Sequence, residues 1–416
     1  MELRIRSNNI FLQFSHIFCI FMCIWFLTPY ISRNGNINII FLFAGFWFLF
    51  AGNSLLKTKR QTTLLLTILW IGLFMFYRYA GISTCAWGNL YIQLFYWMFF
   101  LVYMIYVQEK DEKFLLFLRW VIIVIMIVNI IDNIRLLLEI PNISEIINLS
   151  YGQVYLKTNA GQTSFSFICV LLIVGLTFML RQRYNFIQRI IMWCTIALAL
   201  GYIFLAGRGT AVLALVIFFV LYLIYAIVHN HFRDSWMAYV FFAVVFFTII
   251  YIIFPQVVAN LDEVYSDNRV VTRLKDVVNM LYGVEQYDII SSGESRLELS
   301  FTSLKTWFGS AGSFIFGVGD HRSDEVRENL ALGIGNHAEF FDVFARYGIV
   351  GACLFFKLIS KSLKEGVQRI KRRKDWIIFV VVIILYGCIN NITKYAGMSI
   401  MIYLFCMNII GIEKKQ

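Results

Sequence analysis

Proline and charged residues are scarce in this chain of 416 residues, which contains three prolines and only 15% charged residues. Soluble domains carry about 25% charged residues, so the low charge excludes an ordinary soluble protein. The scarcity of proline, with no Ser/Gly-rich linker, argues against separate modules joined by flexible segments. The composition is otherwise 60% hydrophobic and 18% aromatic. It predicts a membrane protein.

Cysteine pairs of the CxxC kind are also lacking, because the eight cysteines lie singly in or beside apolar runs. Neither a zinc site nor a disulfide framework is indicated, and we expect the cysteines to be small apolar fillers. The chain is apolar from Ile10, but this first run has the length of a span and no A-x-A-like cleavage site. We therefore expect a retained first span.

Runs of about 20 mainly apolar residues, the length needed to cross a bilayer, occur about twelve times. The predicted spans are 10–31, 37–56, 62–82, 87–107, 114–131, 160–180, 189–206, 210–228, 236–254, 343–360, 376–393 and 395–412. The expected fold is an all-α polytopic membrane protein with about 12 transmembrane helices. An N-terminal bundle of about nine spans in 1–254 and a C-terminal bundle of about three in 343–416 flank one long loop, 255–342, with short helices.

Lysine and arginine are distributed unevenly between the predicted loops. With the N-terminus in the cytoplasm every inner loop is basic, and the cluster 369–374 lies inside, as the positive-inside rule requires. Both termini are then cytoplasmic, and the 255–342 loop is extracytoplasmic. The net charge of +11 is explained as a topogenic and lipid-surface feature, so we expect no nucleic-acid partner.

Arg208 is the first candidate functional residue, in the sequence Gly207-Arg208-Gly209-Thr210 between two predicted spans. The flanking glycines allow the backbone to approach a ligand closely, and a guanidinium suits bidentate phosphate contact. The alternative is an arginine that snorkels to lipid phosphates.

Arg296 is the second candidate, at the start of a stretch whose apolar residues are spaced as in an amphipathic helix, 297–308, lying on the bundle. By itself it would be a surface charge paired with Glu294 or Glu298. Its context, a long outer loop with the glycines of Phe316-Gly317-Val318-Gly319-Asp320, makes it a candidate.

The third candidate stretch, 333–351, is polar and enters a predicted span without a basic stop. It places His337 at the outer boundary between water and membrane, where a lone histidine is usually structural. If the segment is helical, Glu339, Asp342 and Arg346 share a face beside the one that carries His337.

The order of these motifs resembles the O-antigen polymerase and O-antigen ligase superfamily: GRGT at a span junction, SR and FGVGD in a long outer loop, then NHAEFFDVFARYGIVG entering a span. The resemblance covers about 207–351, and the N-terminal half agrees only in topology. It implies a GT-C-like fold in the bacterial cytoplasmic (inner) membrane and a glycosyltransferase that uses undecaprenyl-diphosphate-linked glycans. By position it implies that Arg208, Arg296 and His337 are the catalytic residues. The acidic run after His337 is closer to the polymerase branch.

The implied reaction is attack of a sugar hydroxyl on an anomeric carbon, with undecaprenyl diphosphate as the leaving group. Neutral His337 is the candidate base, and Glu339 or Asp342 could orient it or take that role. Arg208 and Arg296 could hold the diphosphate by charge-assisted hydrogen bonds. Three further arginines are candidate substrate contacts: Arg273, Arg322 and Arg346.

No metal or other cofactor is expected, because the acidic pairs of the outer loop, Asp262-Glu263 and Asp324-Glu325, lack a convincing ligand spacing. The resemblance implies as partners a lipid-linked glycan donor and acceptor, membrane lipids, and the chain-length regulator and flippase of the same pathway. The product would be O-antigen, capsule or exopolysaccharide.

Two alternatives stay open: an O-antigen ligase that transfers glycan to lipid A core, and a transporter or flippase of lipid-linked oligosaccharide. Transporters place functional charges near the bilayer midplane. Here the ionisable residues gather at one face, and Arg78, Arg119 and Lys394 are the exceptions within or near predicted spans.

Overall fold

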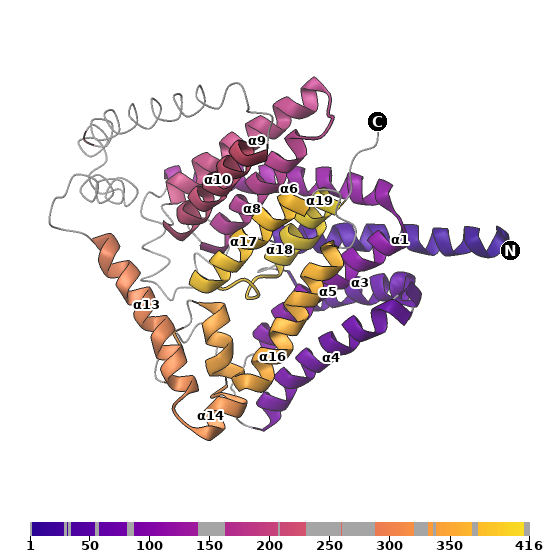
Figure 1. Cartoon of the computed structure of the whole chain (residues 1–416). Coiled ribbons are helices and arrows are strands. Elements are labelled where there is room, and N and C mark those ends of the chain that lie inside the picture. The colour runs from indigo at the N-terminus through magenta and orange to yellow at the C-terminus, as the bar shows by residue number, and fades with distance from the viewer. Residues whose placement is uncertain are drawn as a thin grey trace.

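Every element in the described part of the chain is a helix, which confirms the predicted all-helical class (Figure 1). The computed structural model describes residues 2–28, 31, 35–54, 58–80, 87–139, 163–206, 209–229, 259, 288–319, 332–335, 338–367 and 373–411. The predicted span 236–254 lies outside these residues. So does about half of the predicted outer loop 255–342.

The N-terminal helices follow the predicted apolar runs in order. They are α1 (Glu2–Leu27), α3 (Ile37–Ala51), the 3-10 turn η1 (Gly52–Ser54), α4 (Thr58–Tyr79), α5 (Trp87–Gln108), α6 (Glu112–Glu139), α8 (Thr163–Leu180), α9 (Phe186–Ala206) and α10 (Gly209–His229).

The C-terminal helices begin in the predicted outer loop. They are α13 (Asp288–Trp307), α14 (Ala311–Phe316), α16 (Glu339–Val367), α17 (Arg373–Ile389), α18 (Ala396–Ser399), the π-helical η3 (Ile400–Met407) and α19 (Asn408–Gly411). The predicted helix is confirmed as α13, but it begins earlier than expected. Arg296 therefore lies inside the helix and not at its start. The predicted apolar face does not pack as a whole on the bundle: Phe301 and Phe308 are each 66% exposed, whereas Ser303 is buried.

Five helices of the described part are long and apolar enough to cross a membrane: Thr62–Tyr79, Leu90–Gln108, Glu112–Glu139, Phe186–Ala206 and Glu339–Lys364. Shorter apolar helices cover Phe11–Leu27, Ile37–Ala51, Ser164–Leu180, Thr210–Leu223, Asp375–Ile389 and Ala396–Gly411. Apart from 236–254, each predicted span overlaps one of these helices. The chain is therefore a helical membrane protein by length and composition, while the number of spans and their orientation stay predictions.

Helix α5 lies at the centre of the bundle. Nearly every residue from Phe95 to Tyr106 is buried, and the helix packs against α4, α6, α18 and η3. A helix that is apolar and buried all round belongs in the middle of a bundle. By contrast, α3, α4 and α10 expose large apolar residues, as expected of helices that face lipid.

Helix α16 is bent sharply at Gly348, whose backbone is not helical (φ 58°, ψ −165°). The rings of Phe340 and Phe356 lie 5.5 Å apart, centroid to centroid. In a straight helix their Cα atoms would be separated by ~24 Å. The short first part, 339–347, therefore folds back against the second part, 349–367, and Figure 1 shows the two parts pointing in different directions. The predicted span 343–360 overlaps the candidate span Glu339–Lys364, but it crosses this bend, which the sequence pattern did not predict.

Candidate functional site

Helices α13 and α14 form a corner that packs on α16. Ser310 and Ser313 form a capping box at the start of α14: Ser313 N donates to Ser310 Oγ at 3.0 Å, and Ser310 N donates to Ser313 Oγ at 2.9 Å. Trp307 Nε1 donates to the carbonyl of Phe314 at 3.0 Å, and the two rings stack with centroids 5.0 Å apart. The polar residues around the glycines thus fix the angle between α13 and α14.

Gly317, Val318 and Gly319, which follow α14, lie against the bend of α16 at Gly348. The break at Gly348 leaves carbonyls of the preceding turn without partners inside the helix. Val318 N donates to the carbonyl of Ala345 at 2.8 Å, and Gly319 N donates to that of Arg346 at 2.9 Å. The FGVGD segment therefore supplies the hydrogen bonds that the bend removes.

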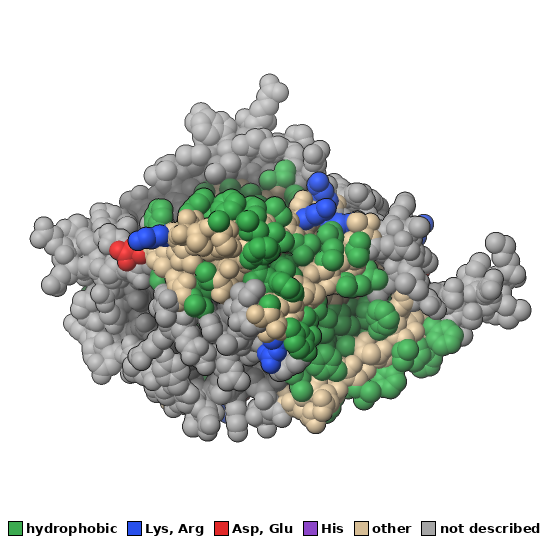
Figure 2. Space-filling model, turned by 90° about the horizontal axis from the view of Figure 1, so that it is seen from below, with side chains coloured by type: hydrophobic (Ala, Val, Ile, Leu, Met, Phe, Trp, Pro, Cys, Tyr) green, Lys and Arg blue, Asp and Glu red, His purple; other side chains and the backbone are tan. Residues whose placement is uncertain are grey.

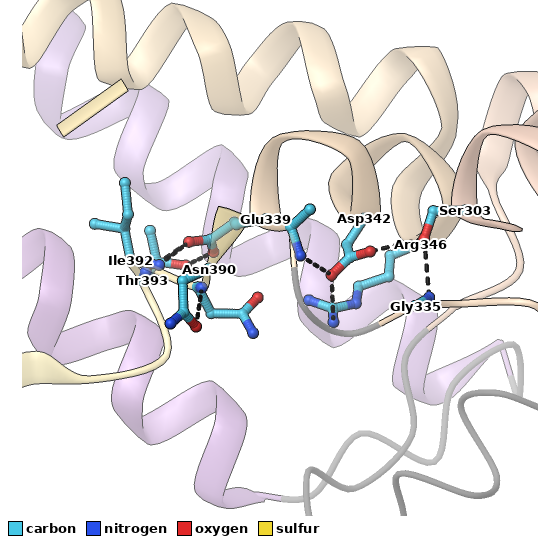
Figure 3. Close-up of polar contacts among 10 residues, drawn as sticks. Ser303, Gly335, Glu339, Asp342, Arg346, Asn390, Ile392 and Thr393 are labelled. Carbon is cyan, nitrogen blue, oxygen red and sulfur yellow. Dashed lines mark hydrogen bonds and ion pairs between the residues drawn. The ribbon is translucent and has the colours of Figure 1, made fainter. Parts of the chain in front are cut away.

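Asp342 is the centre of a buried polar group, which we call the Asp342 cluster: Ser303, Gly335, Ala338, Asp342 and Arg346 (Figure 3). The Ser303 hydroxyl donates to Asp342 Oδ1 at 2.7 Å and accepts from Gly335 N at 2.9 Å. Ala338 N donates to Asp342 Oδ2 at 3.2 Å, and Arg346 Nη2 lies 3.7 Å from the same oxygen. The cluster joins α13, the segment before α16, and the first part of α16.

Glu339 is the centre of a second buried network, which we call the Glu339 network. Its Oε2 accepts from Ile392 N at 2.5 Å and from Thr393 N at 2.7 Å, and the Thr393 hydroxyl donates to Oε1. Gln93 Nε2 donates to the Thr393 hydroxyl at 2.8 Å, and Trp70 Nε1 donates to Gln93 Oε1 at 3.1 Å. The network ties the start of α16 to α4, α5 and the loop between α17 and α18.

A small cavity of about 20 Å³ lies beside the two sets of residues. Its polar lining comprises Gln93, Glu339, Arg346, Thr393 and Lys394, and its apolar lining is mainly aromatic, from Trp70, Phe74 and Tyr347. A volume of this size holds about one water molecule. A sugar would need the cavity to open.

Three of the eight predicted site residues are described, and the fold brings them together. Glu339, Asp342 and Arg346 are all buried, with at most 3% of each exposed. The predicted common face is only partly right: Asp342 pairs with Arg346, whereas Glu339 turns toward the loop on the other side of the first turn of α16 (Figure 3). Glu339 and Asp342 accept hydrogen bonds from other protein groups, so in this structure they hold the first part of α16 in place.

The other predicted site residues lie outside the described part of the chain. They are Arg208, Arg273, Arg322 and His337, and for Arg296 the helix is described but the side chain is not. Their catalytic and binding roles stay predictions.

Sequence reasoning missed three polar residues of this region: Gln93, Ser303 and Thr393. It noted Lys394 only as an ionisable residue near a predicted span. Gln93 and Thr393 carried a usable signal, because each is a polar side chain within a predicted span, where such residues are costly and need partners. Ser303 carried none, because a serine in a surface helix is ordinary.

Among the described residues, no group of three or more His, Cys, Asp or Glu side chains could hold a metal ion. Comparison with known proteins adds no family: no protein-family model and no curated protein matches this chain. The resemblance to the O-antigen polymerase and ligase superfamily thus rests on the motifs alone and stays a prediction.

Proposed function

We propose that this chain is a membrane glycosyltransferase that polymerises undecaprenyl-diphosphate-linked repeat units into a surface polysaccharide. The observation that carries the proposal is convergence. Helix α13 with the SR motif, the FGVGD segment and the segment from Glu339 to Gly348 are separated in sequence, yet they pack together through the Asp342 cluster and the bend of α16. The three segments were chosen from the sequence because one reaction would use them. Their contact in the folded chain is what a shared reaction site would require, and it supports the proposal.

His337 is the proposed base, and the residues on either side of Asn336-His337 support this role. Gly335 is held by the Ser303 hydroxyl, and Ala338 is held by Asp342. These two hydrogen bonds anchor Gly335 and Ala338 to one buried pair. Ser303 and Asp342 are therefore proposed as positioning residues that hold the base toward the acceptor hydroxyl.

Positive charge for the departing diphosphate is proposed to come from Arg208 and Arg296, with Arg273, Arg322 and Arg346 as further contacts. Arg346 and Lys394 line the same small cavity, which would have to widen to admit a phosphate. Removal of one such donor is expected to cost about 3–4 kcal/mol of transition-state stabilisation, or on the order of 10²–10³ in rate.

The test is the glycan profile of the source cell with the gene deleted and then restored. Wild type, His337→Ala and Arg296→Ala are compared at matched protein levels in the membrane. Arg135→Ala is the control, because this exposed arginine pairs with Glu139 on the surface of α6. Glycan is measured both on its final acceptor and on undecaprenyl diphosphate.

If the chain is a polymerase, deletion of the gene should leave single repeats on the final acceptor. The wild-type gene and the Arg135→Ala control should restore long chains, and neither His337→Ala nor Arg296→Ala should do so. Long polymer that accumulates on undecaprenyl diphosphate would instead identify the ligase alternative. An unchanged profile would exclude both.

The transporter alternative has one observation in its favour, a buried cation inside a candidate span. Arg119 of α6 is fully buried, and its Nη2 donates to the carbonyl of Asn408 at 2.8 Å and to Asn408 Oδ1 at 3.0 Å. Ionisable residues inside a bilayer are functional candidates by default. A transporter predicts that deletion traps lipid-linked single repeats in the cytoplasmic leaflet, whereas a polymerase leaves them accessible from outside.

A further inference from the structure

Helix α14 presents three consecutive apolar side chains to the surroundings. Phe314, Ile315 and Phe316 are 38%, 41% and 50% exposed, and Phe308 at the preceding turn is also exposed. These residues lie at the end of the molecule formed by the α13–α14 corner (Figure 1), and Figure 2, which views the molecule from that side, shows hydrophobic side chains over this face. Large apolar side chains grouped in this way mark a surface that binds something.

The exposed surface of α14 continues into the end of helix α4. The Tyr77 hydroxyl of α4 donates to the carbonyl of Phe316, and Tyr77 also lies 3.2 Å from the carbonyl of Tyr347. Phe76 and Tyr79, on either side of Tyr77 in the sequence, are exposed. Helix α14 is therefore fastened to α4 where the candidate span Thr62–Tyr79 ends.

The exposed residues of α4 identify what covers this surface. Its exposed large apolar residues, Leu65, Ile68, Leu69, Phe76 and Tyr79, recur at helical spacing along one side of a candidate membrane span. Such a stripe on a membrane helix faces acyl chains. The α14 side chains extend the stripe beyond the last turn of the span, to the level where aromatic residues gather at the boundary between membrane and water.

We propose that α14 and the last turn of α4 form one lipid-binding surface, seated in the headgroup region of the bilayer. Phe308, Phe314, Ile315 and Phe316 contact the boundary between headgroups and acyl chains. Lys305, exposed one turn before Phe308, is placed to meet lipid phosphates. This inference does not depend on the proposed enzymatic reaction.

The inference has a mechanical consequence for the rest of the site. Val318 and Gly319, directly after α14, donate to the carbonyls of Ala345 and Arg346 in α16. Because of these hydrogen bonds, the depth of α14 in the bilayer also sets the depth of the Asp342 cluster relative to the membrane surface. A site fixed at headgroup level would suit any substrate whose reactive group is attached to a membrane lipid.

The experiment measures the depth of α14 directly in the full chain, reconstituted in nanodiscs of phosphatidylcholine and phosphatidylglycerol. An environment-sensitive fluorescent amino acid replaces Ile315 in one sample and Glu298 in the other. Glu298 is the control, because it is exposed in the middle of α13, about 15 Å along the helix axis from Phe308. Nitroxide-labelled lipids carry the quencher either near the headgroup or near the end of the acyl chain.

The fluorophore at Ile315 should lose more fluorescence with the shallow quencher than with the deep one, and iodide in the buffer should quench it less than the fluorophore at Glu298. Strong iodide quenching at Ile315 with no loss to either lipid quencher would overturn the proposal. Shielding from iodide without lipid quenching, accompanied by energy transfer between labelled protomers, would also overturn it and assign the surface to a second copy of the chain.

Discussion

Gly317 and Gly348 lie against each other's neighbours in a reciprocal contact. A Cβ added to Gly317 would be 2.3 Å from the carbonyl oxygen of Arg346, and a Cβ added to Gly348 would be 2.3 Å from that of Ile315. Both glycines have positive φ, 77° and 58°, with extended ψ. This backbone region is essentially confined to glycine. The bend of α16 and the end of α14 thus require glycine for conformation and for close approach at the same time.

We expect Gly348→Ala to destabilise the protein strongly. The residue would have to leave the glycine region, which costs about 1–3 kcal/mol, and the added methyl would push α14 away from α16. The free energy of unfolding in mixed detergent micelles measures the loss. Gly72→Ala is the control, because a Cβ there meets nothing within 4 Å. If Gly348→Ala and the control have the same free energy of unfolding, the bend of α16 does not require glycine at position 348.

Ser303→Ala tests the Asp342 cluster. The hydroxyl serves Asp342 Oδ1 and Gly335 N at once, so its removal leaves a buried carboxylate oxygen and a buried amide each short of a partner. The expected cost is about 1–3 kcal/mol in the free energy of unfolding. Thr302→Ala, one residue away, removes a hydroxyl that bonds to the carbonyl of Glu298 on the exposed side of α13. If both variants lose the same stability, the Asp342 cluster contributes no special stabilisation.

Glu339→Ala and Glu339→Gln should differ in a definite order. Alanine orphans the amides of Ile392 and Thr393, at about 1–3 kcal/mol for each buried group. Glutamine keeps an acceptor of the same shape and loses mainly the charge assistance of the bonds. Thermal unfolding in detergent should therefore rank wild type above Gln and Gln above Ala. A glutamine variant less stable than the alanine variant would contradict this account of the Glu339 network.

The order of the helices was predictable because apolar runs of bilayer length report directly on burial in lipid. The bend within the predicted span 343–360 was not predictable, because hydropathy reports burial in lipid and does not report the direction of the chain. The close contact between Gly348 and the carbonyl oxygen of Ile315 shows why the chain folds back there. Glu339 and Asp342 were found because they belong to the polar stretch 333–351 that enters a predicted span. Their separate partners were not predictable, since Ser303 and Thr393 come from segments that meet only in the folded protein.

Chelation should leave the proposed transferase activity intact. The expectation rests on the arginines, which can neutralise the departing diphosphate without a divalent cation. Polymerisation by the purified protein, supplied with its lipid-linked repeat unit, is measured with and without EDTA. Loss of activity in EDTA and recovery with Mg²⁺ would contradict the prediction and would direct attention to the acidic pairs Asp262-Glu263 and Asp324-Glu325.

Lys394→Ala distinguishes a binding role of the small cavity from a packing role. Lys394 is half-buried and lines the cavity with Glu339 and Arg346, so it adds positive charge to the cavity lining. If the cavity widens to receive a diphosphate, loss of this charge should raise the KM for the lipid-linked donor by about tenfold, as expected for one lost charge-assisted contact of about 1.5 kcal/mol. The free energy of unfolding should change little, and Lys394→Arg should restore much of the donor affinity. Lys357→Ala, elsewhere on α16, serves as the control for a general effect of charge. An unchanged KM in Lys394→Ala, with wild-type stability, would remove the cavity from the donor site.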